Sequence, residues 1–200
     1  TLALELTVLR FRAHLPNQEH LLRKGYLALT LAGAALYAFV IVPHFWPSGH
    51  ILGRDFSTLD RLLTQPRALV MYLGQIVAPL PQQMPFYYDW FRASRGLLTP
   101  WTTLPCVLLV TGLLFAAWHW RTRRPLFSLG ILLFFAGHFI TSNVIGLELA
   151  FEHRNHFPMI GVVLAVGDLF VAATQRLNLR PRTTGLICCI LLAGLGGATL

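Results

Sequence analysis

Long apolar stretches alternate with short polar segments along most of the chain, and this pattern predicts helices that cross a membrane. A helix needs about 20 predominantly apolar residues to span the hydrocarbon core of a bilayer. Five stretches come close to that length or reach the end of the chain: residues 25–46, 101–120, 125–147, 157–175 and 184–200. Residues 1–10 resemble the tail of an earlier span. We therefore expect an all-α fold, a polytopic bundle of about five transmembrane helices, with residues 1–200 as a fragment of one membrane domain.

A long segment, residues 47–100, separates the first two spans and predicts a loop with helices of its own. Its aromatic content, as in "PFYYDWFRASR", is unlike that of a flexible linker. The stretch "FSTLDRLLTQPR" has apolar residues at helical spacing: Phe56, Leu59, Leu62 and Leu63. With Ser57 or Thr58 as a cap and Pro66 as the end, it predicts an amphipathic helix on the membrane surface. The following apolar run, residues 68–80, is too short to span and predicts an interfacial or re-entrant helix.

Positive charge indicates which side of the membrane is cytoplasmic, because short cytoplasmic loops carry an excess of Lys and Arg. Ten of the sixteen cations precede the first span or lie in two short links between later spans: Arg10, Arg12, Arg23, Lys24, Arg121, Arg123, Arg124, Arg176, Arg180 and Arg182. These segments share one side if every span crosses. The loop at 47–100 and the segment 148–156 are then extracytoplasmic.

Composition narrows the class of protein. Apolar residues make up 55% of the chain and charged residues 12%, which does not describe an ordinary soluble domain. The net charge of +8 is mostly the topology signal above, and it does not form the solvated basic face that nucleic-acid binding needs. We expect membrane lipids and no nucleic acid among the partners. Cys106, Cys188 and Cys189 lie within spans and predict buried, inert thiols.

"FEHRNHFP", residues 151–158, places five consecutive polar residues between apolar stretches. Arg154 lies there on the side where cations are least expected, accompanied by Glu148 and Glu152. A charge that faces lipid near mid-membrane costs about 2.5 to 3.5 kcal/mol, so such groups usually face a protein-lined, water-filled cavity. We predict a cavity at the membrane surface. The alternative is a juxtamembrane anchor, in which Arg154 reaches lipid headgroups.

The residue types in this stretch suit a phosphate group. Arg154 offers a planar fork of donors for phosphate oxygens, and His153, Asn155 and His156 add further donors. Glu152 can orient Arg154 or accept a proton from an incoming hydroxyl. A phosphate at this depth indicates a lipid-linked donor. The two histidines lack a third ligand, so the sequence predicts no metal site, and it predicts no cofactor.

The order of spans, the long extracytoplasmic loop and the stretch "EHRNHFP" resemble the membrane part of bacterial GT-C-type glycosyltransferases. The likeness is to proteins that carry tetratricopeptide repeats, related to the transmembrane and tetratricopeptide-repeat O-mannosyltransferases. In that family a Glu-x-Arg-x-x-x-Pro-like element precedes a late span, matched here by Glu152, Arg154 and Pro158. Residues 62–84 resemble the family stretch in which a basic residue leads into a short apolar helix and a proline.

The resemblance implies transfer of a sugar from a polyprenyl-phosphate-linked donor to an acceptor protein or glycan, on the outer face of the bacterial inner membrane. It implies that Arg154 contacts the carrier phosphate, with Arg67 and Arg92 as second cations. It also implies that the usual catalytic acid lies upstream of Thr1 and that the repeats follow Leu200. Two residues of this chain are candidate catalytic acids: Glu152 and Asp89.

Each loop candidate has a simpler interpretation. Arg67 can stabilise the C-terminal end of a helix through the helix dipole. Asp89, a candidate sugar contact among aromatic residues, can pair with Arg92 three positions later. Asp168 lies within a predicted span and is a functional hypothesis by default, but it can also pair with an arginine of a neighbouring cytoplasmic loop.

Two other functions fit the pattern. A transporter or flippase for a lipid-linked substrate would use the Arg, His and Glu cluster as a gate and Asp168 as a proton relay. No inverted repeat is visible in the sequence, however, and the polar groups gather at one surface. The chain could also be a non-catalytic membrane scaffold for tetratricopeptide repeats.

Overall fold

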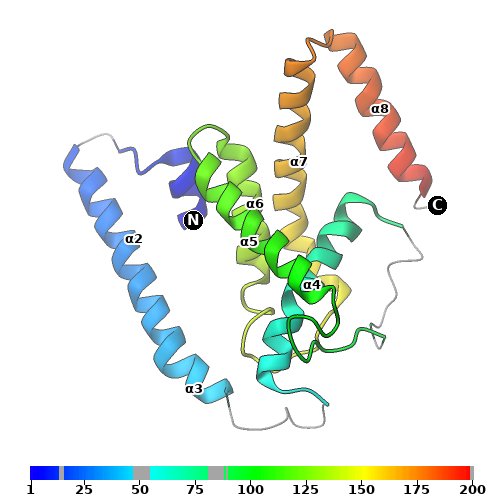
Figure 1. Cartoon of the computed structure of the whole chain (residues 1–200). Coiled ribbons are helices and arrows are strands. Elements are labelled where there is room, and N and C mark those ends of the chain that lie inside the picture. The colour runs from blue at the N-terminus through cyan, green and yellow to red at the C-terminus, as the bar shows by residue number, and fades with distance from the viewer. Residues whose placement is uncertain (14–15, 47–54, 81–87, 89, 199–200) are drawn as a thin grey trace.

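The computed structural model describes residues 1–13, 16–46, 55–80, 88 and 90–198, and every regular element among them is a helix (Figure 1). In chain order the elements are α1 (Leu2–Leu4), the π-helix η1 (Glu5–Leu9), α2 (Pro16–Leu36), the π-helix η2 (Tyr37–Ile41), α3 (Val42–Phe45), α4 (Thr58–Val77), α5 (Thr103–Trp120), α6 (Pro125–His138), the 3₁₀-helix η4 (Glu152–Asn155), α7 (His156–Arg176) and α8 (Pro181–Ala198). The all-α prediction is confirmed for this part of the chain.

Among the described residues, three helices are long and apolar enough to cross a membrane by length and composition: Gln18–Phe45, which runs through α2, η2 and α3, Thr103–Trp120 and His156–Arg176. They are compatible with a membrane protein and correspond to three of the five predicted spans. The other two predicted spans are shorter apolar helices, α6 and α8.

The span predicted at 125–147 is wrong in its second half, because α6 ends at His138. The amides of Thr141 and Ser142 both donate to the His138 carbonyl and close the last turn. Beyond it, the Asn143 side chain accepts a hydrogen bond of 2.9 Å from the Ile145 amide. Short polar side chains compete in this way with helical hydrogen bonds. The chain therefore enters a loop, residues 139–151, called the α6–η4 loop below.

Two glycines let α6 and α7 cross with their backbones in contact. A methyl group at Gly130 would overlap the Gly161 carbonyl oxygen and lie 2.7 Å from the Ala165 nitrogen. One at Gly161 would overlap the Gly130 carbonyl oxygen and lie 2.9 Å from the Phe134 nitrogen. Small residues commonly permit such close approach between helices in membranes.

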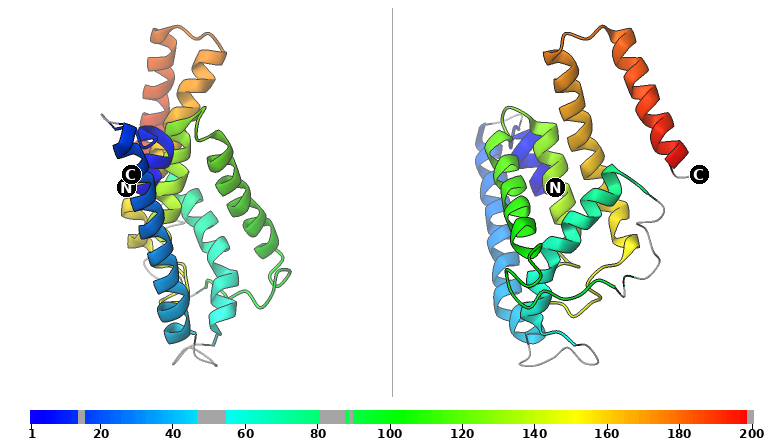
Figure 2. Two further views of the ribbon diagram at one scale, coloured as in Figure 1. Left: turned by 90° about the vertical axis from the view of Figure 1, so that its left-hand side faces the viewer. Right: turned by 45° about the vertical axis from the view of Figure 1, so that its right-hand side comes forward.

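α4 packs on this pair through an apolar cluster that includes Tyr72 of α4, Phe134 of α6 and Val162 of α7. Tyr88 and Phe91, from the segment after α4, join the same cluster. Figure 2 shows α4 beside α5 and the lower part of α7. α4 is therefore part of the helical packing.

α4 runs without interruption through Pro66, so the two helices predicted at 56–67 and 68–80 are one. A proline inside a helix removes one hydrogen bond and costs about 3 kcal/mol. Burial on both sides of Pro66 offsets this cost. Five of the eight buried residues of α4 are polar: Thr58, Arg61, Thr64, Gln65 and Gln75. Leu59, by contrast, is 55% exposed. The helix is amphipathic as predicted, but the face that it buries is polar before Pro66 and joins the apolar cluster through Ala68, Leu69 and Tyr72 after it.

The predicted cap at the start of α4 is present. The Ser57 side chain accepts a hydrogen bond from the Asp60 amide at 3.1 Å, and the Asp60 carboxylate accepts one from the Ser57 amide at 3.0 Å. Partial burial raises the pKa of Asp60, but the hydrogen bonds from Ser57 and the charge of Arg95 outweigh it and hold the pKa below its usual value. The ionised carboxylate is therefore a stabilising partner in this box.

Asp60→Asn should lower the free energy of unfolding by about 1 kcal/mol at pH 7, because it weakens the capping box and removes the charge that faces Arg95. A carboxylate with a lowered folded-state pKa stabilises above its unfolded pKa of about 4, and that contribution is lost as the pH falls through the folded pKa. Thermal unfolding in detergent should therefore separate the variant from wild type at pH 7, and the difference should shrink as the pH falls below the unfolded pKa of about 4.

Asp55→Asn is the matched control, because Asp55 lies on the same segment and contacts Arg95 through its backbone carbonyl. It should change stability by less than about 0.5 kcal/mol. An Asp60→Asn variant as stable as wild type at pH 7 would contradict the assignment.

The basic segments lie at one end of the helices (Figures 1 and 2). This end holds the start of α2, the α5–α6 turn and the α7–α8 turn. Arg10 donates a hydrogen bond of 2.7 Å to the carbonyl of Thr122 in the α5–α6 turn. The α6–η4 loop and the segment before α5 lie at the opposite end. The structure thus separates the cation-rich turns from the segments that were predicted to carry the chemistry.

Candidate functional site

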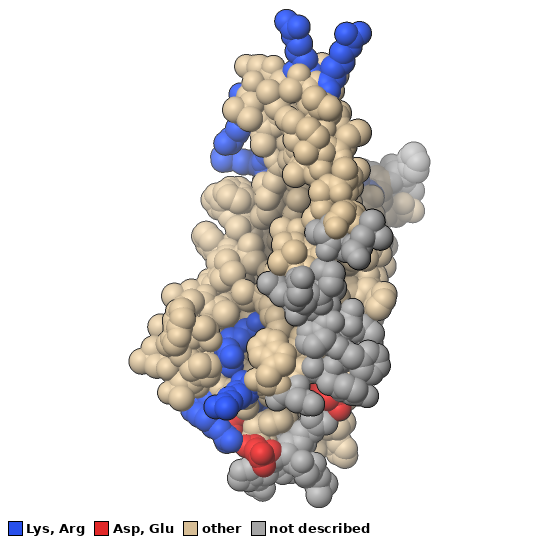
Figure 3. Space-filling model, turned by 90° about the vertical axis from the view of Figure 1, so that its right-hand side faces the viewer, with Lys and Arg blue, Asp and Glu red and all other residues tan. Residues whose placement is uncertain are grey.

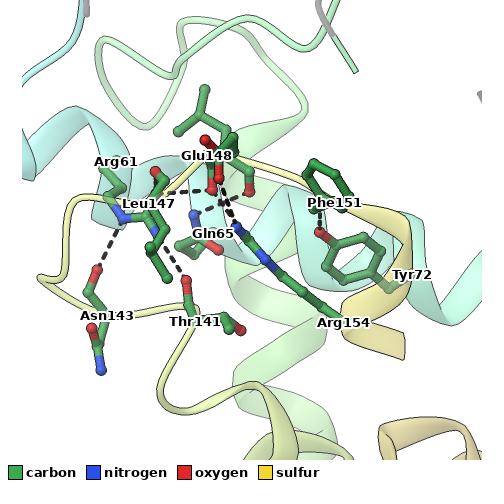
Figure 4. Close-up of polar contacts among 10 residues, drawn as sticks. Arg61, Gln65, Tyr72, Thr141, Asn143, Leu147, Glu148, Phe151 and Arg154 are labelled. Carbon is green, nitrogen blue, oxygen red and sulfur yellow. Dashed lines mark hydrogen bonds and ion pairs between the residues drawn. The ribbon is translucent and has the colours of Figure 1, made fainter. Parts of the chain in front are cut away.

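Arg61 is fully buried and holds the α6–η4 loop from α4. Its guanidinium donates to the carbonyl oxygens of Thr141 at 2.6 Å and of Asn143 and Glu148 at 3.1 Å each, and also to that of Leu147 (Figure 4). Buried carbonyls need such donors where no helix or strand supplies them. Arg61 therefore fixes the course of the loop.

Arg154, from the polar stretch 151–158, reaches into the same loop (Figure 4). It donates a hydrogen bond of 2.8 Å to the Glu148 carbonyl, and its guanidinium forms an ion pair of 3.4 Å with the Glu148 carboxylate. The Arg154 side chain is 8% exposed, whereas that of Glu148 is 50% exposed. Glu148 therefore engages guanidinium donors of Arg154 that a phosphate group would otherwise use.

Tyr72 and His138 connect this region to α4 and α6. The Tyr72 hydroxyl accepts a hydrogen bond of 2.7 Å from the Phe151 amide, and its ring stacks on that of His138 at 5.1 Å. His138 Nε2 lies 3.2 Å from Asn155 Oδ1. The start of α7 is therefore tied to both neighbouring helices.

The polar stretch is thus mainly a junction between helices in the described contacts. Asn155 is bonded to His138, and His156 is exposed at the first position of α7. The carboxylate that orients Arg154 here is Glu148. Two other predicted residues, Glu152 and His153, have their backbone in η4, but their side chains lie outside the described part of the structure, as does all of Asp89.

Three arginines surround a hollow of about 820 Å³ at the same end of the helices: Arg67, Arg92 and Arg95. We call it the arginine hollow. Two of the three, Arg67 and Arg92, are predicted second cations, and the structure brings them together. Aromatic side chains complete the wall: Phe56, Trp90 and Phe91. Figure 3 shows basic side chains gathered toward the lower part of this face, with a belt of uncharged residues between them and the basic group at the top.

Arg67 is fixed in place by contacts on one side of its guanidinium. It donates hydrogen bonds of 2.9 Å to the Arg92 carbonyl and 3.3 Å to the Ser94 hydroxyl. The guanidinium also lies 4.9 Å from the centre of the Phe91 ring. Ser94 is itself buried and bonded to Thr103 at 2.9 Å. Arg67 lies in the middle of α4, so it does not stabilise the C-terminal end of a helix as the simpler interpretation predicted.

The other two arginines differ in how firmly they are held. Arg95 pairs with Asp60 at 3.1 Å and donates to the Asp55 carbonyl. The Arg92 side chain is exposed, and no hydrogen bond or ion pair to the described residues engages its guanidinium. Arg92 is therefore the cation of the hollow that is most available to a ligand.

The arginine hollow adjoins the loop that carries Glu148. Leu149 lines the hollow, and its carbonyl accepts a hydrogen bond of 3.3 Å from Gln65 of α4. Arg61 and Arg154 thus act behind one wall of the hollow, by holding the residues next to Leu149. The predicted cations fall into two groups: Arg67 and Arg92 line the hollow, while Arg154 supports its wall.

The donor set of the hollow favours an anion over a metal. Among the described residues that line it, the charged groups are three guanidiniums and Asp55. Within the described residues, no three His, Cys, Asp or Glu side chains gather as a metal site would require. Guanidinium groups bind phosphate and carboxylate through paired hydrogen bonds.

Comparison of the chain with protein-family models, curated proteins and solved structures found no match in any of the three.

The sequence pattern did not single out Arg61 or Arg95. Arg61 lies between Asp60 and Leu62 in a helix predicted to lie on the membrane surface, where an arginine is expected to face water. A usable signal was the spacing of Thr58, Arg61 and Gln65, which share one helical face with Tyr72.

Proposed function

We propose that this chain is part of a multi-pass bacterial inner-membrane glycosyltransferase, and that the arginine hollow binds the phosphate of a polyprenyl-phosphate-linked sugar donor. The observation that carries the proposal is the convergence of Arg67, Arg92 and Arg95 around one hollow with aromatic walls. The acceptor, a protein or glycan, would approach from the extracytoplasmic side.

The chemistry of the hollow supports a phosphate ligand with a sugar attached. Arg92 offers a donor fork to the phosphate oxygens, and Arg67 adds a second positive charge behind it. Trp90, 61% exposed at the hollow, offers a ring face against which the apolar face of a sugar can pack. The hollow also lies away from the cation-rich turns, which agrees with an extracytoplasmic position under the positive-inside rule.

The proposed topology retains five spans, with α4 as a re-entrant helix. α6, with 14 residues, is about 21 Å long, against a hydrocarbon core of about 30 Å. The α6–η4 loop would therefore enter the membrane depth. Irregular backbone is tolerated there only when it is buried in protein and its polar groups are satisfied, which is what Arg61 provides.

In this proposal Arg154 is a positioning residue, because Glu148 takes up its guanidinium. It would hold Glu148 and Leu149 at the rim of the hollow, and Glu148, with its half-exposed carboxylate, would be near the bound sugar. The roles expected for Arg154 in the sequence thus pass to Arg92 and Arg67.

Arg92→Gln should raise the KM for the sugar donor by about 10- to 100-fold, because a charge-assisted hydrogen bond contributes about 1.5 to 3 kcal/mol. The measurement is transfer of a labelled sugar from a polyprenyl-phosphate donor in membranes that contain the full-length protein. Arg182→Gln, which removes one exposed cation from α8 at the opposite end, is the matched control and should leave KM unchanged.

An unchanged KM for Arg92→Gln at equal expression would remove Arg92 from the donor site. Transport of the donor across the bilayer without sugar transfer would instead favour the flippase. Neither activity in the wild-type protein would favour the scaffold.

A further inference from the structure

A second hollow, of about 430 Å³, lies at the cation-rich end of the helices, between the α5–α6 turn and the last turns of α7. Three arginines line it: Arg123 and Arg124 from the turn, and Arg176 from α7. We call it the α7 hollow. Its remaining lining is mostly apolar and includes Trp120 and two alanines of α7.

Asp168 fixes one of the three cations. Its carboxylate lies 3.2 Å from the Arg124 guanidinium, and both side chains are largely buried, with 17% and 31% exposed. This contact agrees with the pairing predicted for Asp168. One carboxylate against three guanidiniums leaves the hollow positive, and within the described residues no ion pair joins Arg123 or Arg176.

The floor of the hollow suits a hydrocarbon chain. The Trp120 ring packs edge to face on Phe127, with 5.7 Å between ring centres, which holds the indole in position beside the arginines. Ala172 and Ala173 leave the α7 surface shallow at this level. A cationic rim above an apolar floor matches an amphiphile with an anionic headgroup.

We propose that the α7 hollow binds the phosphate headgroup of an anionic phospholipid, with the start of an acyl chain against Trp120 and α7. Basic pockets between transmembrane helices on the cytoplasmic side are suited to such headgroups. The proposal rests on the membrane placement given above, but not on sugar transfer. An inorganic phosphate would satisfy the arginines alone and gain nothing from the apolar floor.

The test is a titration of the full-length protein in mixed micelles with phosphatidylglycerol, phosphatidylcholine or inorganic phosphate, with bound lipid counted by native mass spectrometry. Arg123→Gln combined with Arg176→Gln should weaken phosphatidylglycerol binding roughly 30-fold, from the usual contribution of two cations near an anionic surface. The control pair, Arg180→Gln with Arg182→Gln, removes the same charge from the same end but outside the hollow.

A specific site predicts a change of less than about threefold for the control pair, and retention of most binding in the Arg123→Lys, Arg176→Lys pair, which keeps the charges. Equal weakening by both glutamine pairs would mean diffuse attraction and would overturn the site. Displacement of phosphatidylglycerol by millimolar inorganic phosphate would overturn the lipid assignment. Because lipid retention is measured, neither result depends on whether the arginine hollow binds a sugar donor.

Discussion

Gly161→Ala should destabilise the protein by about 2 to 3 kcal/mol, although the change adds a single methyl group. The new methyl would overlap the Gly130 carbonyl oxygen and press on the Phe134 amide. Both obstacles are backbone atoms, so no side chain can rotate away. α6 and α7 would have to move apart, and the close contact between their backbones would be lost.

Gly167→Ala is the matched control on the same helix, because nothing lies within 4 Å of a methyl group there. It should be neutral or stabilising by up to about 1 kcal/mol, since alanine favours the helical state over glycine. Thermal unfolding of both variants in one detergent gives the comparison. Equal melting temperatures for the two variants would show that α6 and α7 do not cross with their backbones in contact.

Helix positions could be predicted from apolar length, but their ends could not. The lengths of α5 and α7 follow from apolar runs that come close to the length of a span and end at charges. The end of α6 depends on three adjacent polar residues, 141–143, whose side chains can bond either across helices or to their own backbone. The local sequence is compatible with both, and Arg61 of α4 decides between them by binding the carbonyls of the loop.

Pro66 illustrates a second limit on what the sequence alone can predict about the helices. Proline is a sound signal for the end of a helix when local energies decide. Here Arg61 and Gln65 before the proline and Tyr72 after it are all buried against other elements, and their contacts require one continuous helix. Tertiary packing therefore overrides a local preference of a few kcal/mol, which a single sequence cannot reveal.

The candidate site was predictable in its chemistry more than in its geometry. Arg67 and Arg92 are 25 positions apart, and a count of charges could name both without showing that the Arg67 guanidinium meets the Arg92 backbone. The sequence predicts Arg154 as a phosphate contact because it lies in an unusual run of polar residues. That run has a structural cause, since the Phe151 amide bonds to Tyr72 of α4 and the Asn155 side chain to His138 of α6 at the start of α7. The exposed cation, Arg92, lies elsewhere.

Arg61→Met should destabilise the protein by about 3 to 5 kcal/mol, since the carbonyls of Thr141, Asn143 and Leu147 lose their donor and each unsatisfied acceptor costs about 1 to 3 kcal/mol. The Glu148 carbonyl keeps its hydrogen bond from Arg154. Removal of the buried Arg61 charge also removes its desolvation penalty, which offsets part of this loss of stability and keeps the destabilisation below about 5 kcal/mol. Methionine fills similar space, so the effect measures the hydrogen bonds and charge more than the volume. The loss should appear first in the α6–η4 loop, whose amides should exchange with deuterium faster than those of α5.

Arg61→Lys separates charge from donor geometry. Lysine keeps the positive charge but concentrates its donors on one nitrogen, and it cannot reach carbonyls spread over Thr141 to Glu148. We expect a loss of about half that of Arg61→Met, with the same local pattern of exchange. Arg182→Met, at an exposed position of α8, should leave both stability and exchange unchanged. If Arg61→Met exchanged like wild type in the loop, Arg61 would not be what holds it, and the wall shared with the arginine hollow would need another support.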